Sequence, residues 1–290
     1  WSMQWELLGS SLSLEDASSG FGGADRIFVQ YNDGDYRWFA KHEYIAEEFR
    51  AEAGFIPRLG YHQVMTKFDL YFRDVGGMNF GSPGFYVSSY LDESGKAIEH
   101  FAGSNFYIRW AGHLWTFTKY EIRPELIETS DEWLLPQRLD LAIGSQVTPG
   151  LNLNTSVEFG TSIIRDEDIL DGRAPFLGRS IDYEAGFEAR PLPSILLGGG
   201  GRGRALFDEK NELLGEDLII AGLGEWYMNR DDSLRVIYQR SLGDDSWSTD
   251  LLGTHRPVSG FIGYLGYRLE SSGGELIQRV FMKASYQFGT

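Results

Sequence analysis

Near its carboxyl terminus the chain reads Val280-Phe281-Met282-Lys283-Ala284-Ser285-Tyr286-Gln287-Phe288. Every second residue is apolar or aromatic, and the residues between them are mainly polar, with Phe281 as the exception. Successive side chains of a β-strand point to opposite faces, so the stretch predicts a strand with one apolar and one polar face. A soluble antiparallel sheet with one wet face alternates in the same way, and the rest of the chain must distinguish the two.

Composition limits how such a chain could meet a membrane. The 290 residues are 42% hydrophobic with a mean hydropathy of -0.27. No stretch approaches the roughly 20 consecutive apolar residues that a membrane helix needs, so any membrane crossing must be made by strands. Aromatic residues make up 14% of the chain and there are 36 glycines. Aromatic girdles and closely packed strands would use both, although a soluble β-sandwich has the same composition.

Two further counts exclude whole classes of site. The chain has no cysteine, which rules out disulfides, thiolate metal sites and cysteine nucleophiles. Its net charge of -16 disfavours binding to nucleic acid, because there is no basic surplus to displace counterions.

The sequence starts at Trp1 without an initiator Met or a signal peptide. We expect residues 1–290 to be a single domain that is processed, or is the C-terminal part of a longer polypeptide.

Alternation recurs along the whole chain. The most regular segments are 151–159 and 180–190, where one face is apolar and the other polar. Such strands suit a wall with lipid on one side and water on the other. Many exceed the mean soluble strand of about 5–6 residues and reach the roughly 9–11 needed to cross a bilayer. Fourteen strands are predicted, near residues 2–14, 25–32, 35–45, 61–73, 84–92, 96–109, 113–122, 138–147, 151–163, 179–190, 194–206, 217–228, 233–242 and 276–288.

The connections alternate in length. Short turns are predicted at 33–34, 111–112, 148–150, 191–193 and 229–232. Longer, acidic connections are predicted around 45–60, 123–137, 164–178, 207–216 and 243–275. Short periplasmic turns and long external loops are the outer-membrane pattern, and counting back from the final strand places all five short turns on the periplasmic side. Residues 261–269 also alternate, but one more crossing would reverse this order, so we assign them to the last external loop.

These arguments predict an all-β fold, namely an antiparallel transmembrane β-barrel of about 14 strands in the outer membrane of a Gram-negative bacterium. The final strand resembles the terminal strand that outer-membrane barrels present to the barrel assembly machinery, with Tyr286 and Phe288 as its aromatic signal. Outer-membrane lipids and lipopolysaccharide would then surround the chain. We expect no cofactor, no metal and no nucleic-acid partner.

A second resemblance concerns residues 48–58, Glu-Phe-Arg-Ala-Glu-Ala-Gly-Phe-Ile-Pro-Arg. They resemble the "phenylalanine, acidic, Gly-Phe-Val-x-Arg" signature of a poorly characterised bacterial family of outer-membrane barrels. The turn at 148–150 and the strands around 236–239 and 283–286 follow a similar order. The resemblance covers about residues 30–288 and implies a barrel preceded by a carbohydrate-binding-like module of family nine. That module is absent from this chain, and 243–275 is longer than the family pattern implies.

Residues on the polar faces would line the interior, because Lys or Arg facing lipid near the midplane costs about 2–4 kcal/mol. The predicted acidic wall consists of Asp140, Glu158, Asp182, Glu184 and Glu188. The predicted basic wall consists of Arg37, Lys41, Lys67, Arg73, Arg202, Arg204, Arg235, Arg279 and Lys283. Opposed charges across a water-filled constriction order water and select polar solutes.

Two functions follow from such an interior. The first is a channel or transporter for small polar solutes. The second is a sealed barrel whose charges pair across a filled interior, since buried charges generally need partners. A sealed barrel would serve as a membrane anchor or docking component for a sugar-binding module, a lipoprotein or a secretion partner. Single-channel conductance distinguishes the two.

Four other features are candidate sites. Glycines 198–201 lack the context of a phosphate-binding loop and are interpreted as room for a neighbouring bulky side chain. The chain is not expected to be an enzyme, but His100 with Ser88 or Ser89 on a paired strand leaves an outer-membrane lipid hydrolase as an alternative. Carboxylates at 166–171 suit Ca²⁺ or a solvated loop, of which we favour the loop. The external motif Gly54, Phe55 and Arg58 is interpreted as structural.

Overall fold

The structure is a computed structural model that describes residues 1–14, 17–47, 60–127, 130–165, 174–256 and 261–286. Its described strands form one antiparallel sheet of 19 strands, which confirms the predicted all-β fold. Within these residues the only helical segment is the 3-10 turn η1, Ala111–His113. No helix in the described ranges is long and apolar enough to cross a membrane.

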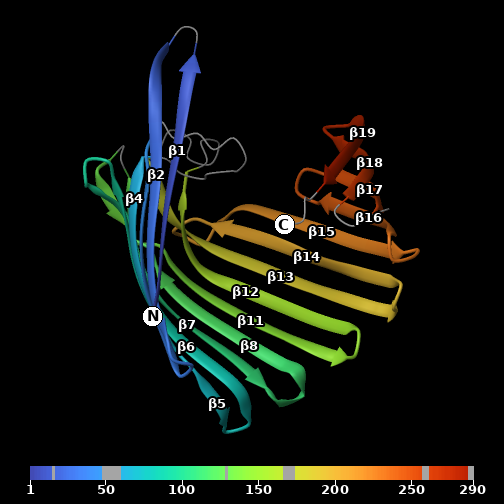
Figure 1. Cartoon of the computed structure of the whole chain (residues 1–290), viewed down its shortest axis with the longest axis horizontal. Helices are drawn as coiled ribbons and strands as arrows, with labels where there is room; N and C mark the ends of the chain where they lie inside the picture. The colour runs from blue at the N-terminus through green and yellow to red at the C-terminus, as the bar shows by residue number, and fades with distance from the viewer. Residues whose placement is uncertain (15–16, 48–59, 128–129, 166–173, 257–260, 287–290) are drawn as a thin grey trace. The chain divides into compact units, whose positions relative to one another are not determined.

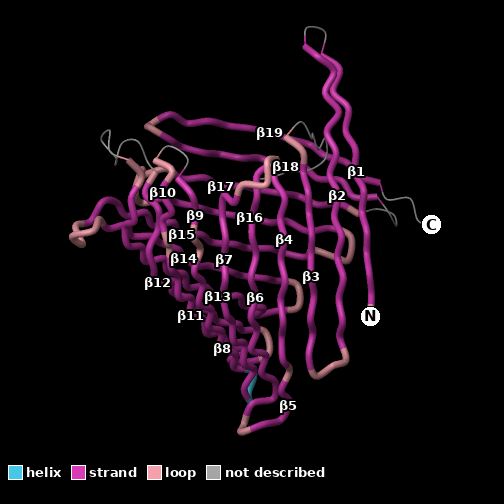
Figure 2. Tube along the Cα trace, turned by 90° about the vertical axis from the view of Figure 1, so that its left-hand side faces the viewer, coloured by secondary structure: helices cyan, strands magenta, loops and turns pink. Residues whose placement is uncertain are grey.

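The chain divides into two compact units. Unit 1 consists of Trp1–Ala111, Phe117–Asp140 and Gly160–Gly178. Its strands are β1 (Ser2–Leu14), β2 (Ala17–Asn32), β3 (Tyr36–Ile45), β4 (Tyr61–Leu70), β5 (Phe72–Val75), β6 (Met78–Asp92), β7 (Ala97–Trp110), β9 (Glu125–Ile127) and β10 (Glu132–Leu134). Strands β1, β2, β3, β4, β6 and β7 pair in that order, as Figure 2 shows for β2 to β7.

Unit 2 consists of Gly112–Thr116, Leu141–Phe159 and Arg179–Thr290. Its strands are β13 (Phe176–Leu192, from Arg179 onward), β14 (Ile195–Phe207), β15 (Leu213–Tyr227), β16 (Asp232–Ser241), β17 (Trp247–His255), β18 (Phe261–Ser272) and β19 (Glu275–Tyr286). Each pairs with the next in sequence, and β13, β14 and β15 run side by side in Figure 1. The remaining strands, β8 (Leu114–Ile122), β11 (Gln137–Thr148) and β12 (Leu151–Ile164), are divided between the units.

In unit 1 the sheet has the reverse polarity of a soluble domain. On β4, Gln63 is 4% exposed while its neighbour Val64 is 51% exposed. On β6, Ser88 is 3% exposed while Val87 is 52% exposed. The buried pair is linked by a 3.1 Å hydrogen bond from Gln63 Nε2 to Ser88 Oγ. A water-soluble sheet would cover its apolar face, so this one is built for apolar surroundings on that face.

Unit 2 repeats the arrangement. Its exposed large side chains include Leu197, Ile220 and Trp226, whereas Ser180 and Glu225 are buried. Because directly opposed residues of paired strands share a face, the register defines two surfaces across the whole unit. We call them the apolar face and the polar face of the unit, and we use the same names in unit 1.

The glycine-rich strand β14 fits the apolar face by making room for aromatic rings. Gly203 lies directly opposite Tyr183, and Gly199 directly opposite Phe187. A Cβ atom on Gly203 would lie 2.3 Å from the Tyr183 ring, and one on Gly199 would lie 2.9 Å from the Phe187 ring. Only glycine leaves space for the rings against the strand. The prediction that glycines 198–201 admit a neighbouring bulky side chain is confirmed at Gly199.

The assignment of residues 243–275 to one external loop is wrong. Strands β17 and β18 occupy most of it, with β17 paired to β16 and β18 paired to both β17 and β19. The prediction failed because Trp247–His255 does not alternate cleanly, with Asp250, Leu251 and Leu252 in succession. Two extra strands, unlike one, keep the five predicted short turns on one side, although the two-residue connection between β18 and β19 falls on the other side. The parity argument therefore survives the correction.

The number of strands also differs from the predicted 14. Sixteen of the 19 described strands have nine or more residues, and the three short ones are β5, β9 and β10. The five predicted short turns all fall between consecutive long strands. The two strands missing from the prediction are thus β17 and β18, and the short β9 and β10 lie in the predicted loop at 123–137.

Candidate functional site

The polar face of unit 1 holds two buried carboxylates that bind several of the predicted cations. Asp69 on β4 accepts a 2.7 Å hydrogen bond from Arg37 on β3, and Lys67 lies 3.0 Å from its other oxygen. Its side chain is only 3% exposed. A Cβ atom at Gly84 would lie 2.4 Å from Asp69 Oδ1, so the glycine on β6 provides the space for this carboxylate.

Glu43 on β3 is the second buried carboxylate. Arg26 on β2 donates from Nε at 2.8 Å, the Lys41 ammonium lies 3.2 Å away, and the Tyr61 hydroxyl donates at 3.1 Å. Three donors on a buried carboxylate compensate for the hydration it has lost. The two clusters together place three of the predicted cations, Arg37, Lys41 and Lys67, in contact with carboxylates on the same or an adjacent strand.

Unit 2 pairs its charges in the same way. Arg204 on β14 lies 3.3 Å from Asp182 on β13, and Arg235 on β16 lies 3.0 Å from Glu225 on β15. Arg279 on β19 lies 2.7 Å from Glu270 on β18. A further pair, Arg268 with Asp250, joins β18 to β17. Each pair joins neighbouring strands, so the charges compensate one another along the wall.

Three of the other predicted residues make longer contacts with an opposite charge. Arg73 lies 3.7 Å from Asp35, Asp140 lies 3.9 Å from Lys119, and Glu188 lies 3.8 Å from Arg190. Glu158 lies on β12, and Lys283 is exposed on β19. The external motif Gly54, Phe55 and Arg58 lies outside the described residues, as do the carboxylates at 166–171 and Phe288; Tyr286 ends β19. The opposition of an acidic and a basic wall stays a prediction.

The carboxylates Asp69, Glu43, Glu225, Glu270 and Asp250 were not predicted as site residues. The positions of Asp69 and Glu43 could have been read from the sequence, because each shares the strand and the parity of a predicted cation. Asp69 follows Lys67 by two residues and Glu43 follows Lys41 by two. The parity was applied only to find walls of one sign, so the acceptors beside each cation were overlooked.

A pocket of about 430 Å³ with polar and apolar lining lies on the polar face of unit 2. We call it the trough. Its floor follows three directly opposed small residues, Gly186, Gly200 and Ala221, on β13, β14 and β15. Its polar lining consists of Asn152, Asn154, Glu184, Glu188, Arg202 and Gln239. Three of these are predicted wall residues, which the structure brings together around one depression.

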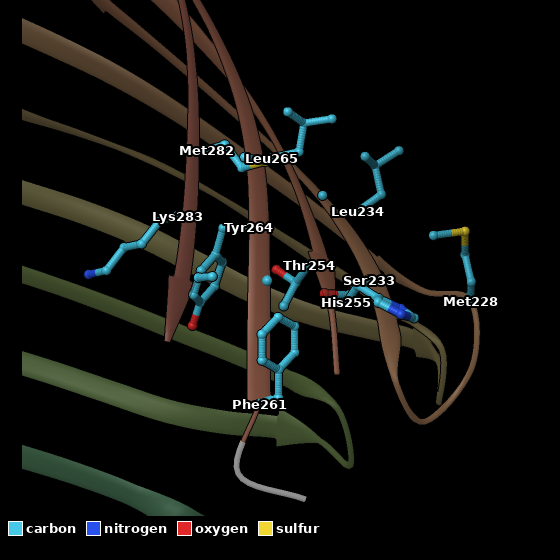
Figure 3. Close-up of a pocket in the computed structure, with 13 residues that line it drawn as sticks. Met228, Ser233, Leu234, Thr254, His255, Phe261, Tyr264, Leu265, Met282 and Lys283 are labelled. Carbon is cyan, nitrogen blue, oxygen red and sulfur yellow. The ribbon is translucent and has the colours of Figure 1, made fainter. Parts of the chain in front are cut away.

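A different pocket, of about 400 Å³, lies among β16, β17, β18 and β19. In Figure 3, Leu234 and Leu265 project to one side of the ribbons, while Tyr264 and Lys283 project to the other. The side with the leucines belongs to the apolar face, on which Leu265 and Met282 are exposed. Such a depression suits hydrocarbon chains better than a polar solute.

The structure also brings together Ser89 and His100. Their side chains meet at 2.8 Å, between Ser89 Oγ and His100 Nδ1. The His100 ring stacks on Trp133, with ring centroids 5.4 Å apart. Ser89 follows the buried Ser88, which points to the polar face, so Ser89 and His100 lie on the apolar face. The other residue proposed for such a pair, Ser88, bonds instead to Gln63.

Comparisons with known proteins place this geometry among outer-membrane proteins. No protein-family model matches the chain, and no curated protein matches it in sequence. Among solved structures it is similar to in-vitro folded OmpT, an outer membrane protein of Vibrio cholerae, with 12% identity over 98% of this chain and 95% of that chain and a TM-score of 0.51. A mutant of the Rh. blastica porin has 12% identity, coverage of 99% and 100%, and a TM-score of 0.48. The OmpT comparison shows that the chain has the fold of an outer-membrane protein.

We predict that Arg235→Ala destabilises the folded protein by about 2–3 kcal/mol, because it leaves the buried Glu225 carboxylate without its guanidinium. The measurement is the free energy of unfolding in urea, followed by tryptophan fluorescence in lipid vesicles. Arg240→Ala is the matched control, since Arg240 on the same strand pairs with the exposed Asp245. It should cost less than about 1 kcal/mol. Equal losses in the two variants would contradict the prediction.

Proposed function

We propose that this chain is a transmembrane β-barrel channel for small polar solutes in the outer membrane of a Gram-negative bacterium. Its 16 long strands are an even number, as bacterial outer-membrane barrels have. Barrels of 16–18 strands are wide enough to enclose an aqueous channel. The apolar face would contact outer-membrane lipids and lipopolysaccharide, and the polar face would contact water.

The arrangement of ion pairs is the observation that carries this proposal. The pairs at Asp69, Glu43, Asp182, Glu225 and Glu270 all join residues of one strand or of adjacent strands. Charges that pair along the wall leave the centre of a barrel open to water. A filled interior would instead need pairs that reach across it. Exposed Glu184, Glu188 and Arg202 support a hydrated wall as well.

The sealed barrel is the competing function. Such a barrel would anchor a sugar-binding module or dock a lipoprotein or secretion partner, and its strands would be inserted by the same barrel assembly machinery. A sealed barrel also agrees with the resemblance of residues 48–58, because the family they resemble carries a module upstream of its barrel. Conduction separates the two functions.

We predict that the purified, folded protein gives discrete current steps in KCl across a planar lipid bilayer. The reason is that a wall of locally paired charges holds water that ions can enter. Folding is verified beforehand by the shift in electrophoretic mobility on heating in SDS. Folded protein that gives no current would overturn the channel and favour the sealed barrel.

Closure of the barrel is a further part of the proposal. Strand β1 has one described partner, β2, and β19 has one, β18. Both carry exposed apolar residues, including Met3 on β1 and Val280 and Met282 on β19. An unpaired strand edge within lipid leaves backbone groups without hydrogen bonds, which a membrane does not tolerate. We propose that β1 and β19 pair.

The test uses double-cysteine variants, which the absence of native cysteine allows. Met3→Cys is combined in turn with Val280→Cys, Met282→Cys and Ala284→Cys. Closure predicts that at least one pair forms a disulfide on mild oxidation, because paired strands bring Cα atoms within the roughly 4.4–6.8 Å that a disulfide spans. Met3→Cys with Leu251→Cys on β17 is the control and should stay reduced. No disulfide in any of the three pairs would contradict closure.

The contact between Ser89 and His100 favours lipid hydrolysis as a second candidate function. His100 Nδ1 lies within reach of the Ser89 hydroxyl proton, and both residues face the apolar surroundings where lipid esters would lie. Against it, the hydrogen bonds described for the His100 ring include no carboxylate to orient it.

If the pair is catalytic, parent protein releases fatty acid from phospholipid or lipopolysaccharide in mixed micelles. Both Ser89→Ala and His100→Ala should then reduce the rate at least about 10²-fold. Ser88→Ala is the matched control on the other face and should retain the rate. Absence of hydrolysis by the parent protein would end this candidate.

A further inference from the structure

The trough on the polar face of unit 2 combines free charge of both signs with an open floor. Glu184 on β13 and Arg202 on β14 are directly opposed, so their Cβ atoms are about 5 Å apart. Within the described residues neither side chain belongs to an ion pair shorter than 4.0 Å. The Glu184 carboxylate can thus accept hydrogen bonds from a solute, and the neighbouring Arg202 guanidinium can donate them.

The charged neighbours of these two residues already form ion pairs. Two residues further along β14, Arg204 lies 3.3 Å from Asp182. At the other end of the trough, Glu188 lies 3.8 Å from Arg190. The pair Glu184 and Arg202 therefore supplies the charges that remain available to a solute in the trough.

The floor beside this pair is clear of side chains that would block a solute. Gly186 and Gly200 are directly opposed on β13 and β14, and Ala221 continues the row on β15. A Cβ atom at Gly200 would lie 2.5 Å from the carbonyl oxygen of Ala185, so a larger residue does not fit the strand there. The row ends at polar amides. Asn154 Oδ1 lies 3.2 Å from the Cβ position of Gly186, and Gln239 is directly opposed to Ala221.

From this arrangement we propose that the trough binds zwitterionic α-amino acids. The α-carboxylate would accept from the Arg202 guanidinium and the α-ammonium would donate to Glu184, because both groups are attached to one carbon and the two protein charges are adjacent. The amino-acid side chain would lie on the glycine and alanine floor, with Asn154 and Gln239 at its ends. The site deepens the proposed function, on which its role in solute passage rests.

Binding is measured directly by titrating L-alanine into the detergent-solubilised protein and following saturation-transfer NMR. Propionamide, an uncharged solute of similar size, is the comparison ligand. We expect L-alanine to bind more tightly than propionamide. Arg202→Gln should raise the Kd for L-alanine about tenfold, which is the effect of losing one charge-assisted hydrogen bond. Ala221→Leu, which fills the floor, should also weaken binding.

Arg204→Gln is the matched control, because it removes the same charge from the same strand and face outside the trough. Its Kd should stay within about twofold of the parent value. The site is overturned if L-alanine binds no better than propionamide, or if Arg202→Gln and Arg204→Gln weaken binding equally. KCl currents recorded for every variant separate the two proposals. Currents without alanine binding leave the channel and remove the site, whereas alanine binding without currents leaves the site and removes the channel.

Discussion

The inverted polarity of the sheet is the constraint on which the rest of the structure depends. Exposed Val64, Val87 and Trp226 would be a liability for a protein surrounded by water, because contiguous exposed apolar side chains drive association. Gln63 and Glu225 are buried on the opposite face. In a bilayer the same distribution is favourable, and an outward Lys or Arg near the midplane would cost about 2–4 kcal/mol. Charged side chains near the middle of a long strand must therefore face the other way.

The charged side chains are therefore concentrated on the polar face, where they form ion pairs. Asp69 forms ion pairs with Arg37 and Lys67, and Glu225 forms one with Arg235. Each pair lies within one strand or between adjacent strands. Local pairing removes the cost of isolated buried charge without filling the space between distant strands. Because ion pairs are the rule on this wall, charged residues that form none stand out. Where a directly opposed Glu184 and Arg202 stay apart over a floor of glycine and alanine, the wall retains charge for a solute.

The sequence predicted the parts of this arrangement that depend on local periodicity. In strands such as β12 and β13, apolar and polar residues alternate with the period of 2 that a strand requires. Their ends were therefore predicted to within a few residues. Strand β17 was missed because Asp250, Leu251 and Leu252 interrupt the alternation and only pairing with β16 and β18 defines it. The trough was out of reach for a related reason. Its residues come from five strands, and the register that aligns them is a property of pairing.

A scan of β17 with nitroxide labels tests the inverted wall most directly. The chain has no cysteine, so single cysteines can be placed at each position from 248 to 252 and labelled in lipid vesicles. The account predicts that labels at 249 and 251 collide mainly with lipid-soluble oxygen, and that labels at 248, 250 and 252 collide mainly with a water-soluble nickel chelate. Equal access of the nickel chelate to all five positions would contradict it, because that is the behaviour of a solvated loop.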